Sequence, residues 1–262
     1  GVYQKKVYKY CAGYRYNDPT IVGFSHTHFN GTGHSDLGDI LIMPTTGELK
    51  LNPGTADHPE NGYRSRFSHD TEKSVPGYYE VMLDDYQVKA QLTATARVGV
   101  HRYTFPKDEQ GRIILDLNHG IYNYDGKTLW AQIRVENDTL LTGYRITNGW
   151  ARTNYTYFAI SLSKPIRNYG YQDMQKIDYK GFEFDTSDTP ELVVKVALSA
   201  TSTEGALKNL QAEAMGKSFD KLAQEASDKW NKQLASLEVE GTEDQKAMFY
   251  TSYYHTMINP SV

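Results

Sequence analysis

The residues best suited to chemistry lie close together near the start of the chain, where Gly23–Gly47 reads GFSHTHFNGTGHSDLGDILIMPTTG. His26 and His28 are two residues apart, so in an extended strand their side chains would point to the same side. Gly31 and Gly33 allow the backbone to turn sharply and to come close to a ligand. Three histidines and two aspartates around such a bend predict one wall of a binding site.

Each of these polar side chains also has a structural interpretation. Asp36 and Asp39 can hydrogen-bond the turn that enters a buried strand at residues 40–43, closed by a proline, and for Asp39 we favour that role. His26 has apolar neighbours in sequence and could be a buried histidine with satisfied hydrogen bonds. His28 fits a ligand contact and a scaffold role equally well, because so short a run does not reveal which alternating positions are buried.

A metal site is a third interpretation of the same loop. His26, His28, His34 and Asp36 are of the residue types that zinc accepts. The His-x-His spacing is typical of cupin metal sites, but the next glutamate, Glu48, follows a proline and an expected strand, which fits poorly. A cupin-like metalloenzyme is therefore a less favoured alternative.

Composition excludes several classes of protein. The formal net charge of −4 over 262 residues argues against a nucleic-acid-binding face. No apolar run approaches the ~20 residues of a membrane helix, and the single Cys11 excludes an internal disulfide framework. Tyrosine is abundant, with 21 residues beside 9 phenylalanines, which suits ligand-stacking surfaces and also strands in general. No signal peptide is visible, which says nothing about export.

Residues 1–200 have the pattern of a β-protein. From Tyr86 to His101 apolar and polar residues alternate strictly, which predicts one long strand or two bent ones, with a bulge near His101–Arg102. Turns at Asp84–Asp85 and Asn137–Asp138 predict two hairpins. Many short antiparallel strands indicate a large β-sandwich. The strands expected at and beyond the hairpins are Tyr78–Leu83, Trp130–Glu136, Thr139–Thr147, Arg112–Leu117, Tyr155–Leu162, Phe182–Phe184 and Glu191–Leu198.

The period changes to that of helices at residue 201, which divides the chain into a sandwich at 1–200 and a helical part at 201–262. Thr201 with Glu204 predicts a capping box for the first helix, a second helix starts at Ser218, and Thr242 with Gln245 caps a third. An apolar stripe on this last helix needs a partner. We therefore expect that the chain is cut off, and that two copies associate through residues 247–258.

Two segments carry a resemblance to a known family. The Gly23–Gly47 run resembles the N-terminal domain of glycoside hydrolase family 92, the calcium-dependent exo-acting α-mannosidases. Trp230–Pro260, which reads WNKQLASLEVEGTEDQKAMFYTSYYHTMINP, is similar to that family's passage into its catalytic (α/α) barrel, and Cys11–Tyr14 with Tyr16 is similar to its aromatic segment before the loop. A Gly- and Pro-rich segment that usually precedes this region, and the barrel itself, are absent from the sequence.

The resemblance implies inverting hydrolysis of terminal α-linked mannose, with α-1,2 as the family-level linkage. It places both catalytic carboxylates and the Ca²⁺ ligands in the barrel, so this chain carries no catalytic or metal residue and is expected to be inactive alone. It also implies secretion to the periplasm or cell surface of a glycan-degrading bacterium. This chain would form the other wall of the cleft, with contacts to the glycan from His26, His28, Asn30, Thr32, His34 and Tyr14 or Tyr16.

A stand-alone carbohydrate-binding sandwich is the main alternative function, because of the tyrosine content. Two further segments are noted on their residue types. Asn118-His119-Gly120 follows an expected strand and is favoured as an ordinary turn. Trp150 lies beyond a strand end and could stack on a ligand, although we favour a core position.

Overall fold

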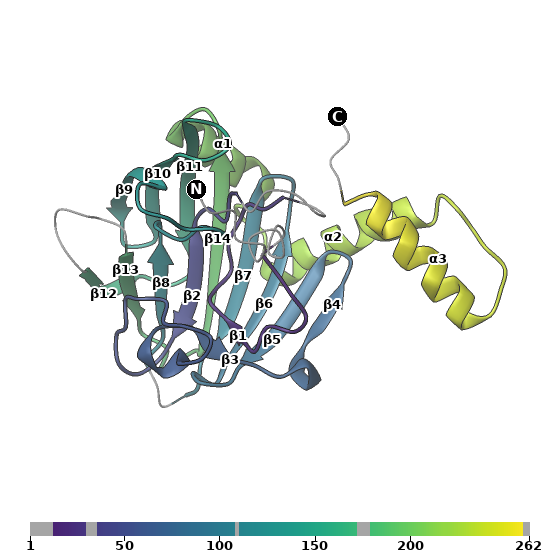
Figure 1. Ribbon diagram of the computed structural model, residues 1–262, viewed down its shortest axis with the longest axis horizontal. Helices are drawn as coiled ribbons and strands as arrows, with labels where there is room; N and C mark the ends of the chain where they lie inside the picture. Colours follow the sequence, from purple (N-terminus) through teal and green to yellow (C-terminus); the bar gives the residue numbers. More distant parts are fainter. Residues whose placement is uncertain (1–12, 30–35, 108–109, 172–178, 259–262) are drawn as a thin grey trace.

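Two antiparallel sheets packed face to face form the body of the molecule (Figure 1). The computed structural model describes residues 13–29, 36–107, 110–171 and 179–258. The larger sheet has the strand order β4-β5-β6-β7-β14-β11-β10-β9. The predicted antiparallel β-sandwich is therefore confirmed. The strands of this sheet are β4 (Lys73–Val75), β5 (Tyr78–Leu83), β6 (Val88–Ala94), β7 (Val98–Thr104), β9 (Thr128–Asn137), β10 (Leu140–Thr147), β11 (Asn154–Leu162) and β14 (Glu191–Ser199).

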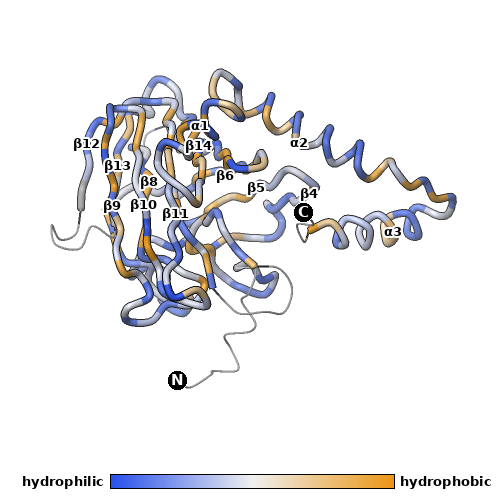
Figure 2. Tube along the Cα trace, turned by 90° about the horizontal axis from the view of Figure 1, so that it is seen from above, coloured by the Kyte–Doolittle hydropathy of each residue, from blue (hydrophilic) through white to orange (hydrophobic). Residues whose placement is uncertain are grey.

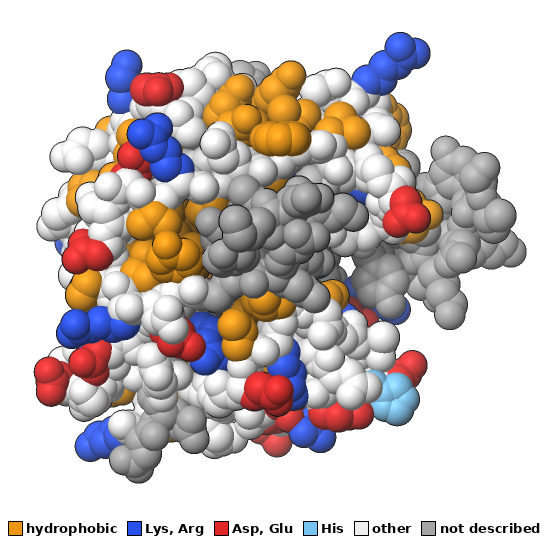
Figure 3. Space-filling model, turned by 90° about the vertical axis from the view of Figure 1, so that its left-hand side faces the viewer, with side chains coloured by type: hydrophobic (Ala, Val, Ile, Leu, Met, Phe, Trp, Pro, Cys, Tyr) orange, Lys and Arg blue, Asp and Glu red, His pale blue; other side chains and the backbone are white. Residues whose placement is uncertain are grey.

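The smaller sheet has the order β12-β13-β8-β2, and two short strands from the first third of the chain, β1 and β3, form a separate pair. The side of the molecule that carries β9 and β12 exposes several hydrophobic side chains (Figure 3). Leu129 and Trp130 of β9 and Tyr169 of β12 are exposed. The bounds are β1 (Thr20–Ile21), β2 (Leu41–Thr45), β3 (Ser65–Arg66), β8 (Arg112–Asp116), β12 (Ile166–Tyr171) and β13 (Tyr179–Phe184).

The apolar core lies between the two sheets. Every residue of β2 and β8 is buried, as expected for strands covered on both faces. From the larger sheet, Val81, Tyr103 and Phe158 reach into the same cluster. The strand predicted to stop at Pro44 continues through it, because β2 is an edge strand and a proline there costs no ladder hydrogen bond on its open side.

The alternating run at 86–101 forms two strands joined in a hairpin, so of the two predicted alternatives the single long strand is wrong. β6 and β7 pair from Lys89↔Thr104 to Ala94↔Gly99 without a register shift, which also excludes the predicted bulge at His101–Arg102. The apolar alternation continued through the turn because Val98 and Val100 face a second core on the outer side of the sheet. Residues 99, 101 and 103 carry the inner face instead.

Two helices cover this outer face. α1 (Thr203–Glu213) packs on β14 and β11, and α2 (Phe219–Leu234) packs on β6 and β7. Their buried side chains, including Leu210 and Phe219, form the second core with Val98 and Val100. The N-cap of α1 is Ser202, whose hydroxyl accepts from Gly205 N, so the predicted capping box at Thr201 is wrong by one residue. The predicted start of α2 at Ser218 is confirmed.

The third helix, α3 (Glu243–Thr256), stands away from the sandwich (Figure 2). Its capping box of Thr242 and Gln245 is confirmed. None of its residues is buried, and its ring contact with α2 joins Trp230 and Tyr254 at 4.7 Å between centroids. Within the described ranges, no helix is long and apolar enough to cross a membrane.

Candidate functional site

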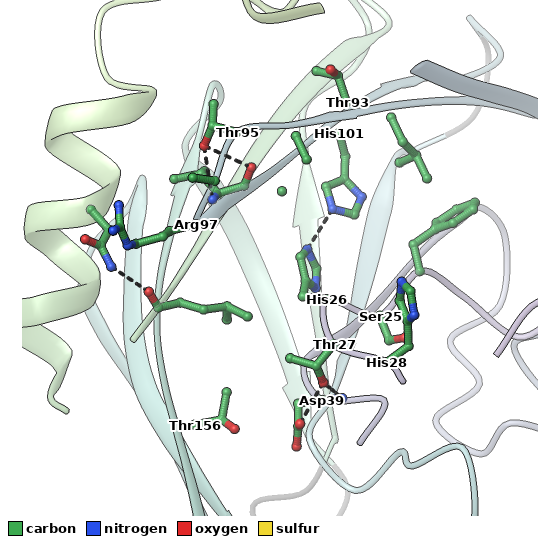
Figure 4. Close-up of a pocket in the computed structure, with 18 of the residues that line it drawn as sticks. Ser25, His26, Thr27, His28, Asp39, Thr93, Thr95, Arg97, His101 and Thr156 are labelled. Carbon is green, nitrogen blue, oxygen red and sulfur yellow. Dashed lines mark hydrogen bonds between the residues drawn. The ribbon is translucent and has the colours of Figure 1, made fainter. Parts of the chain in front are cut away.

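A cleft of about 1240 Å³ opens between the histidine loop and the larger sheet (Figure 4). Its walls come from segments far apart in sequence: the loop at 24–28, the β6–β7 hairpin, the start of β11 and the junction of β14 with α1. Polar side chains dominate the part drawn in Figure 4. They include Ser25, His26, Thr27, His28, Asp39, Thr93, Thr95, Arg97, His101 and Thr156.

His26 belongs to a directional chain of hydrogen bonds along this wall. Its Nδ1 lies 2.6 Å from the carbonyl oxygen of Ile40, so this nitrogen carries the proton and donates. Its Nε2 must then accept from His101 Nε2, at 2.8 Å, and His101 Nδ1 accepts from the Tyr103 hydroxyl at 2.6 Å. Both imidazoles are therefore neutral and both ring nitrogens of His26 are in use, which favours the scaffold interpretation of this residue.

Burial has the electrostatic effect expected for such a pair. It lowers the pKa of His26 to about 4, although the hydrogen bond to Ile40 acts in the opposite direction. Burial and then the neighbouring His26 also lower the pKa of His101 well below its usual value. Gly99 makes the contact possible, since a Cβ on this residue would lie 2.6 Å from Cδ2 of His26.

His28 lines the same cleft but is exposed. Its Nδ1 donates to the carbonyl oxygen of Phe29 at 2.9 Å. This bond leaves a lone pair on Nε2, and within the described part of the chain that nitrogen has no hydrogen-bond partner. His28 can therefore accept a hydrogen bond from a ligand hydroxyl.

Asp39 anchors the loop from below. The Thr27 hydroxyl donates to its carboxylate at 2.7 Å, and Asp39 N donates back to the same hydroxyl oxygen at 2.9 Å (Figure 4). Arg145, which is fully buried in β10, pairs with the carboxylate at 3.2 Å. These bonds are the turn-stabilising role favoured for Asp39. It is the only carboxylate among the described residues that line the cleft, and Arg145 holds it in place.

The tip of the β6–β7 hairpin forms the cleft's other rim and is fixed by Glu213 of α1. The Thr95 hydroxyl donates to this carboxylate at 2.5 Å, and Arg97 donates through its backbone N at 2.9 Å and its guanidinium at 2.8 Å. Burial acts to raise the pKa of Glu213, but the hydrogen bonds from Thr95 and Arg97 outweigh it and lower the pKa. The hairpin tip is thus a preorganised part of the wall.

The two predicted tyrosine contacts have other partners in the structure. Tyr14 is outside the set of residues that line the cleft; its hydroxyl donates to Glu72 at 3.2 Å. Tyr16 stacks on His69 with centroids 3.9 Å apart. Asn30, Thr32 and His34 fall outside the described residues.

Two segments named on sequence grounds have clear positions. Asp116 accepts from the backbone N–H groups of Asn118 and His119, at 2.7 and 2.9 Å, so this segment is the turn that was favoured. Burial lowers the pKa of His119 to about 3. Trp150 is 74% exposed, so the core position favoured for it is wrong.

A metal has no evident site on this wall. Among residues 13–29, 36–107, 110–171 and 179–258, no group of three or more His, Cys, Asp or Glu side chains could hold an ion. His26 turns toward His101 and His28 toward Phe29, so the His-x-His pair does not converge. The described residues therefore do not fit calcium or the cupin-like arrangement.

Sequence reasoning missed the hairpin residues Thr95, Arg97 and His101. No motif marks them, because the cleft is assembled from strands and helices distant in sequence. One signal was present: the apolar pattern changes phase after His101 to Tyr103 and Phe105. In the structure the phase changes earlier, in the β6–β7 turn, after which residues 99, 101 and 103 carry the inner face.

Comparison with known proteins gives the family. A model of the glycosyl hydrolase family 92 N-terminal domain matches residues 2–199, and a model of the same family's catalytic domain matches residues 205–262. The chain belongs to glycosyl hydrolase family 92. The first match spans the sandwich with its histidine loop, and the second begins inside α1.

Solved structures of family 92 share this fold. An α-mannosidase from Bacteroides thetaiotaomicron, solved with mannoimidazole, is 36% identical with a TM-score of 0.88 over 97% of this chain. An inverting mannosidase from the same species is 27% identical with a TM-score of 0.78 over 94% of the chain. A protein from Arthroderma benhamiae named as an uncharacterized secreted glycosidase is 23% identical over 95% of the chain. The chain spans 35%, 33% and 36% of these relatives, respectively.

Proposed function

We propose that this chain forms the substrate-binding wall of an inverting exo-α-mannosidase that removes terminal mannose from glycans, with α-1,2 as its linkage. One observation carries the proposal: in a family 92 chain, the histidine loop that bears the resemblance opens onto the 1240 Å³ cleft. Ligand pockets commonly lie in such clefts between structural units. The catalytic barrel is the partner that would close it.

In this mechanism the present chain binds and orients, and the bond is broken by groups outside it. An inverting glycosidase needs a carboxylic acid and a carboxylate about 6.5–9.5 Å apart. The described lining offers only Asp39, already paired with Arg145, so both groups belong to the barrel. When bound in the barrel, Ca²⁺ would supply Lewis-acid chemistry and orient sugar hydroxyls.

The roles of individual residues follow from the wall's geometry. His28 accepts a hydrogen bond from a sugar hydroxyl through Nε2, and Arg97 donates from the opposite rim. His26 keeps the loop against β7 through His101. Asn30, Thr32, His34 and Tyr14 remain proposed contacts by family resemblance.

The cellular setting is proposed on the same basis. A relative named as secreted and two bacterial structural relatives support a protein that acts on glycans outside the cytoplasm, at the cell surface or in the periplasm.

A chimeric enzyme tests the proposal. Residues 1–258 are joined at α3 to the barrel of the 36%-identical Bacteroides mannosidase, and mannose release from α-1,2-mannobiose is followed by NMR. We expect turnover with β-mannose as the first anomer formed, and a His28→Ala variant with a raised KM. The matched control is Asp228→Ala, on α2 and outside the cleft lining, which leaves KM unchanged.

Two outcomes count against the proposal. A folded chimera without turnover contradicts the wall's role in this reaction. Mannose release by the isolated 262-residue chain contradicts the assignment of the catalytic acids to the barrel. Saturable binding of mannosides by the chain, with no gain in turnover in the chimera, supports the alternative of a stand-alone carbohydrate-binding sandwich.

A further inference from the structure

A buried ion pair joins three loops at the edge of the cleft. Asp36, at the end of the histidine loop, pairs through Oδ1 with Lys127, which directly precedes β9. Its Oδ2 accepts from the backbone N of Trp150, in the β10–β11 loop, at 2.9 Å. Both charged residues are buried. Removing charges from water costs free energy. The buried pair of Asp36 and Lys127, called the clamp below, is therefore a feature that the fold maintains at a cost.

The β10–β11 loop is built closely around the clamp. A Cβ on Gly149 would overlap the Asp36 carboxylate, so a side chain there would displace the carboxylate from this position. Asn148 N donates to the carbonyl of Lys127 at 2.8 Å, and the Tyr124 hydroxyl donates to the carbonyl of Asn148 at 2.9 Å. The backbone that carries Trp150 is therefore held on both sides.

The clamp presents aromatic rings to solvent. Trp150 is 74% exposed and Tyr124 is 41% exposed. Lys127 Nζ lies 5.8 Å from the centre of the Tyr124 ring, and Tyr122 lies 5.7 Å from it, centroid to centroid. The exposed indole of Trp150 contributes little to stability through hydrophobic burial. Packing of the core therefore does not explain why the β10–β11 loop is held by so many hydrogen bonds.

The segments that carry Asp36 and Trp150 lead into the lining of the cleft. Leu37, next to Asp36, lines the cleft, as do Asn154 and Tyr155 at the start of β11, just after Trp150. A glycan chain that left the cleft on this side would pass over the loop that carries Trp150. Rigid aromatic side chains bind well because little conformational entropy is lost when they are covered.

We propose that Trp150 and Tyr124 form a distal sugar-binding platform, on which a pyranose ring remote from the cleaved bond stacks. This inference rests on the proposed function for the nature of the ligand, an α-linked manno-oligosaccharide of three or more sugars. Asp36 and Lys127 are positioning residues that hold the platform at the cleft's edge.

The test uses the 262-residue chain, which has three tryptophans and thus three indole N–H signals in a ¹⁵N NMR spectrum. Trp→Phe variants assign them. The probes are methyl α-mannoside, α-1,2-mannobiose and α-1,2-mannotriose. We expect the Trp150 signal to shift with mannotriose and to stay in place with the monosaccharide, while Trp230, which lines the cleft, responds to shorter ligands.

Variants supply the quantitative test. Trp150→Ala should weaken mannotriose binding about tenfold, as for a central aromatic contact, and leave methyl α-mannoside binding unchanged. Trp130→Ala is the matched control, because Trp130 is also exposed, at 60%, but lies on β9 and outside the cleft lining. Lys127→Met, with folding checked by circular dichroism, should weaken only the longer ligand.

The remaining outcomes of the NMR experiment and of the chimera distinguish failure of the platform from failure of the proposed function. No shift of Trp150 at ligand concentrations up to about 10 mM, where weak contacts are still visible, overturns the platform. If Trp230 responds to mannosides and Trp150 does not, the platform is wrong while the proposed function stands. If Trp150 responds but the chimera has no turnover, the platform stands and the proposed function fails.

Discussion

At the scale of single residues, the hydrogen-bond directions around His26 explain how a polar loop is attached to a strand. Nδ1 donates to Ile40, so Nε2 must accept, and His101 must donate to it. A proton added to His26 would place two N–H groups face to face. The attachment therefore exists only while both rings are neutral.

This arrangement predicts a pH-dependent contribution to stability. The pKa of His26 is lowered from its ordinary value of 6.5 to about 4 by burial in the folded protein, so the unfolded chain binds more protons between these values. The contribution is complete above about pH 6.5 and is lost as the pH falls toward 4, by about 1.4 kcal/mol per pH unit at most.

His26→Asn isolates this effect, because asparagine keeps a donor near the Nδ1 position but does not titrate. The difference in unfolding free energy between wild type and variant, from urea denaturation, should be largest near about pH 7 and shrink by about pH 5. Comparing the two proteins cancels the contributions of Asp116 and His119, whose pKa values are also shifted. A constant difference across this range would contradict the neutral pair.

At the scale of elements, the conformation of the β6–β7 hairpin tip is stabilised by contacts with helix α1. Glu213→Gln removes the charge that receives three donors from Thr95 and Arg97. We expect a loss of about 1–2 kcal/mol in unfolding free energy, and faster hydrogen exchange at the Arg97 amide.

Glu225→Gln serves as the comparison for that variant. Glu225 is another helix glutamate, paired with Lys217 at 2.8 Å nearer the surface, where such pairs contribute little to stability. Equal losses in the two variants, with unchanged exchange at the hairpin tip, would show that Glu213 does not fix the rim.

The elements also show what sequence patterns can and cannot predict. The antiparallel sandwich, the start of α2 and the capping box of α3 follow from local signals: alternation, turn residues and side-chain caps. The β6–β7 turn was not predicted from the pattern. Val98 and Val100 are apolar because they pack against the helices in the second core, and they do not belong to the core between the sheets. Alternation of apolar residues indicates that one face of a strand is covered, but it does not indicate whether a sheet or a helix covers that face.

The same reasoning applies to the cleft. The histidine loop was identifiable because its residues are contiguous in sequence. The other cleft residues include His101 and Asn154 from strands and Arg97 from a hairpin turn, whose neighbours are set by the topology of the sheet. The exposure of Trp150 depends on a buried pair formed by two residues 91 positions apart, which no local window contains.

At the scale of the whole molecule, α3 is the element with the weakest attachment. It has no buried residue, and Met248 is 70% exposed. We predict that the isolated chain self-associates through residues 247–258, and that a version ending at Gly241 is monomeric in sedimentation velocity. The shortened chain should keep the melting temperature of the sandwich within a few degrees. A monomeric 262-residue chain would exclude this association.

Strand β7 makes structural contacts on both of its faces. Val98 and Val100 pack with residues of α1 in the second core, while Gly99 and His101 hold His26 in place. In a close-packed interior a strand cannot yield on one side and keep its position on the other. A displacement of the helices on the outer face would therefore reach the histidine loop through β7.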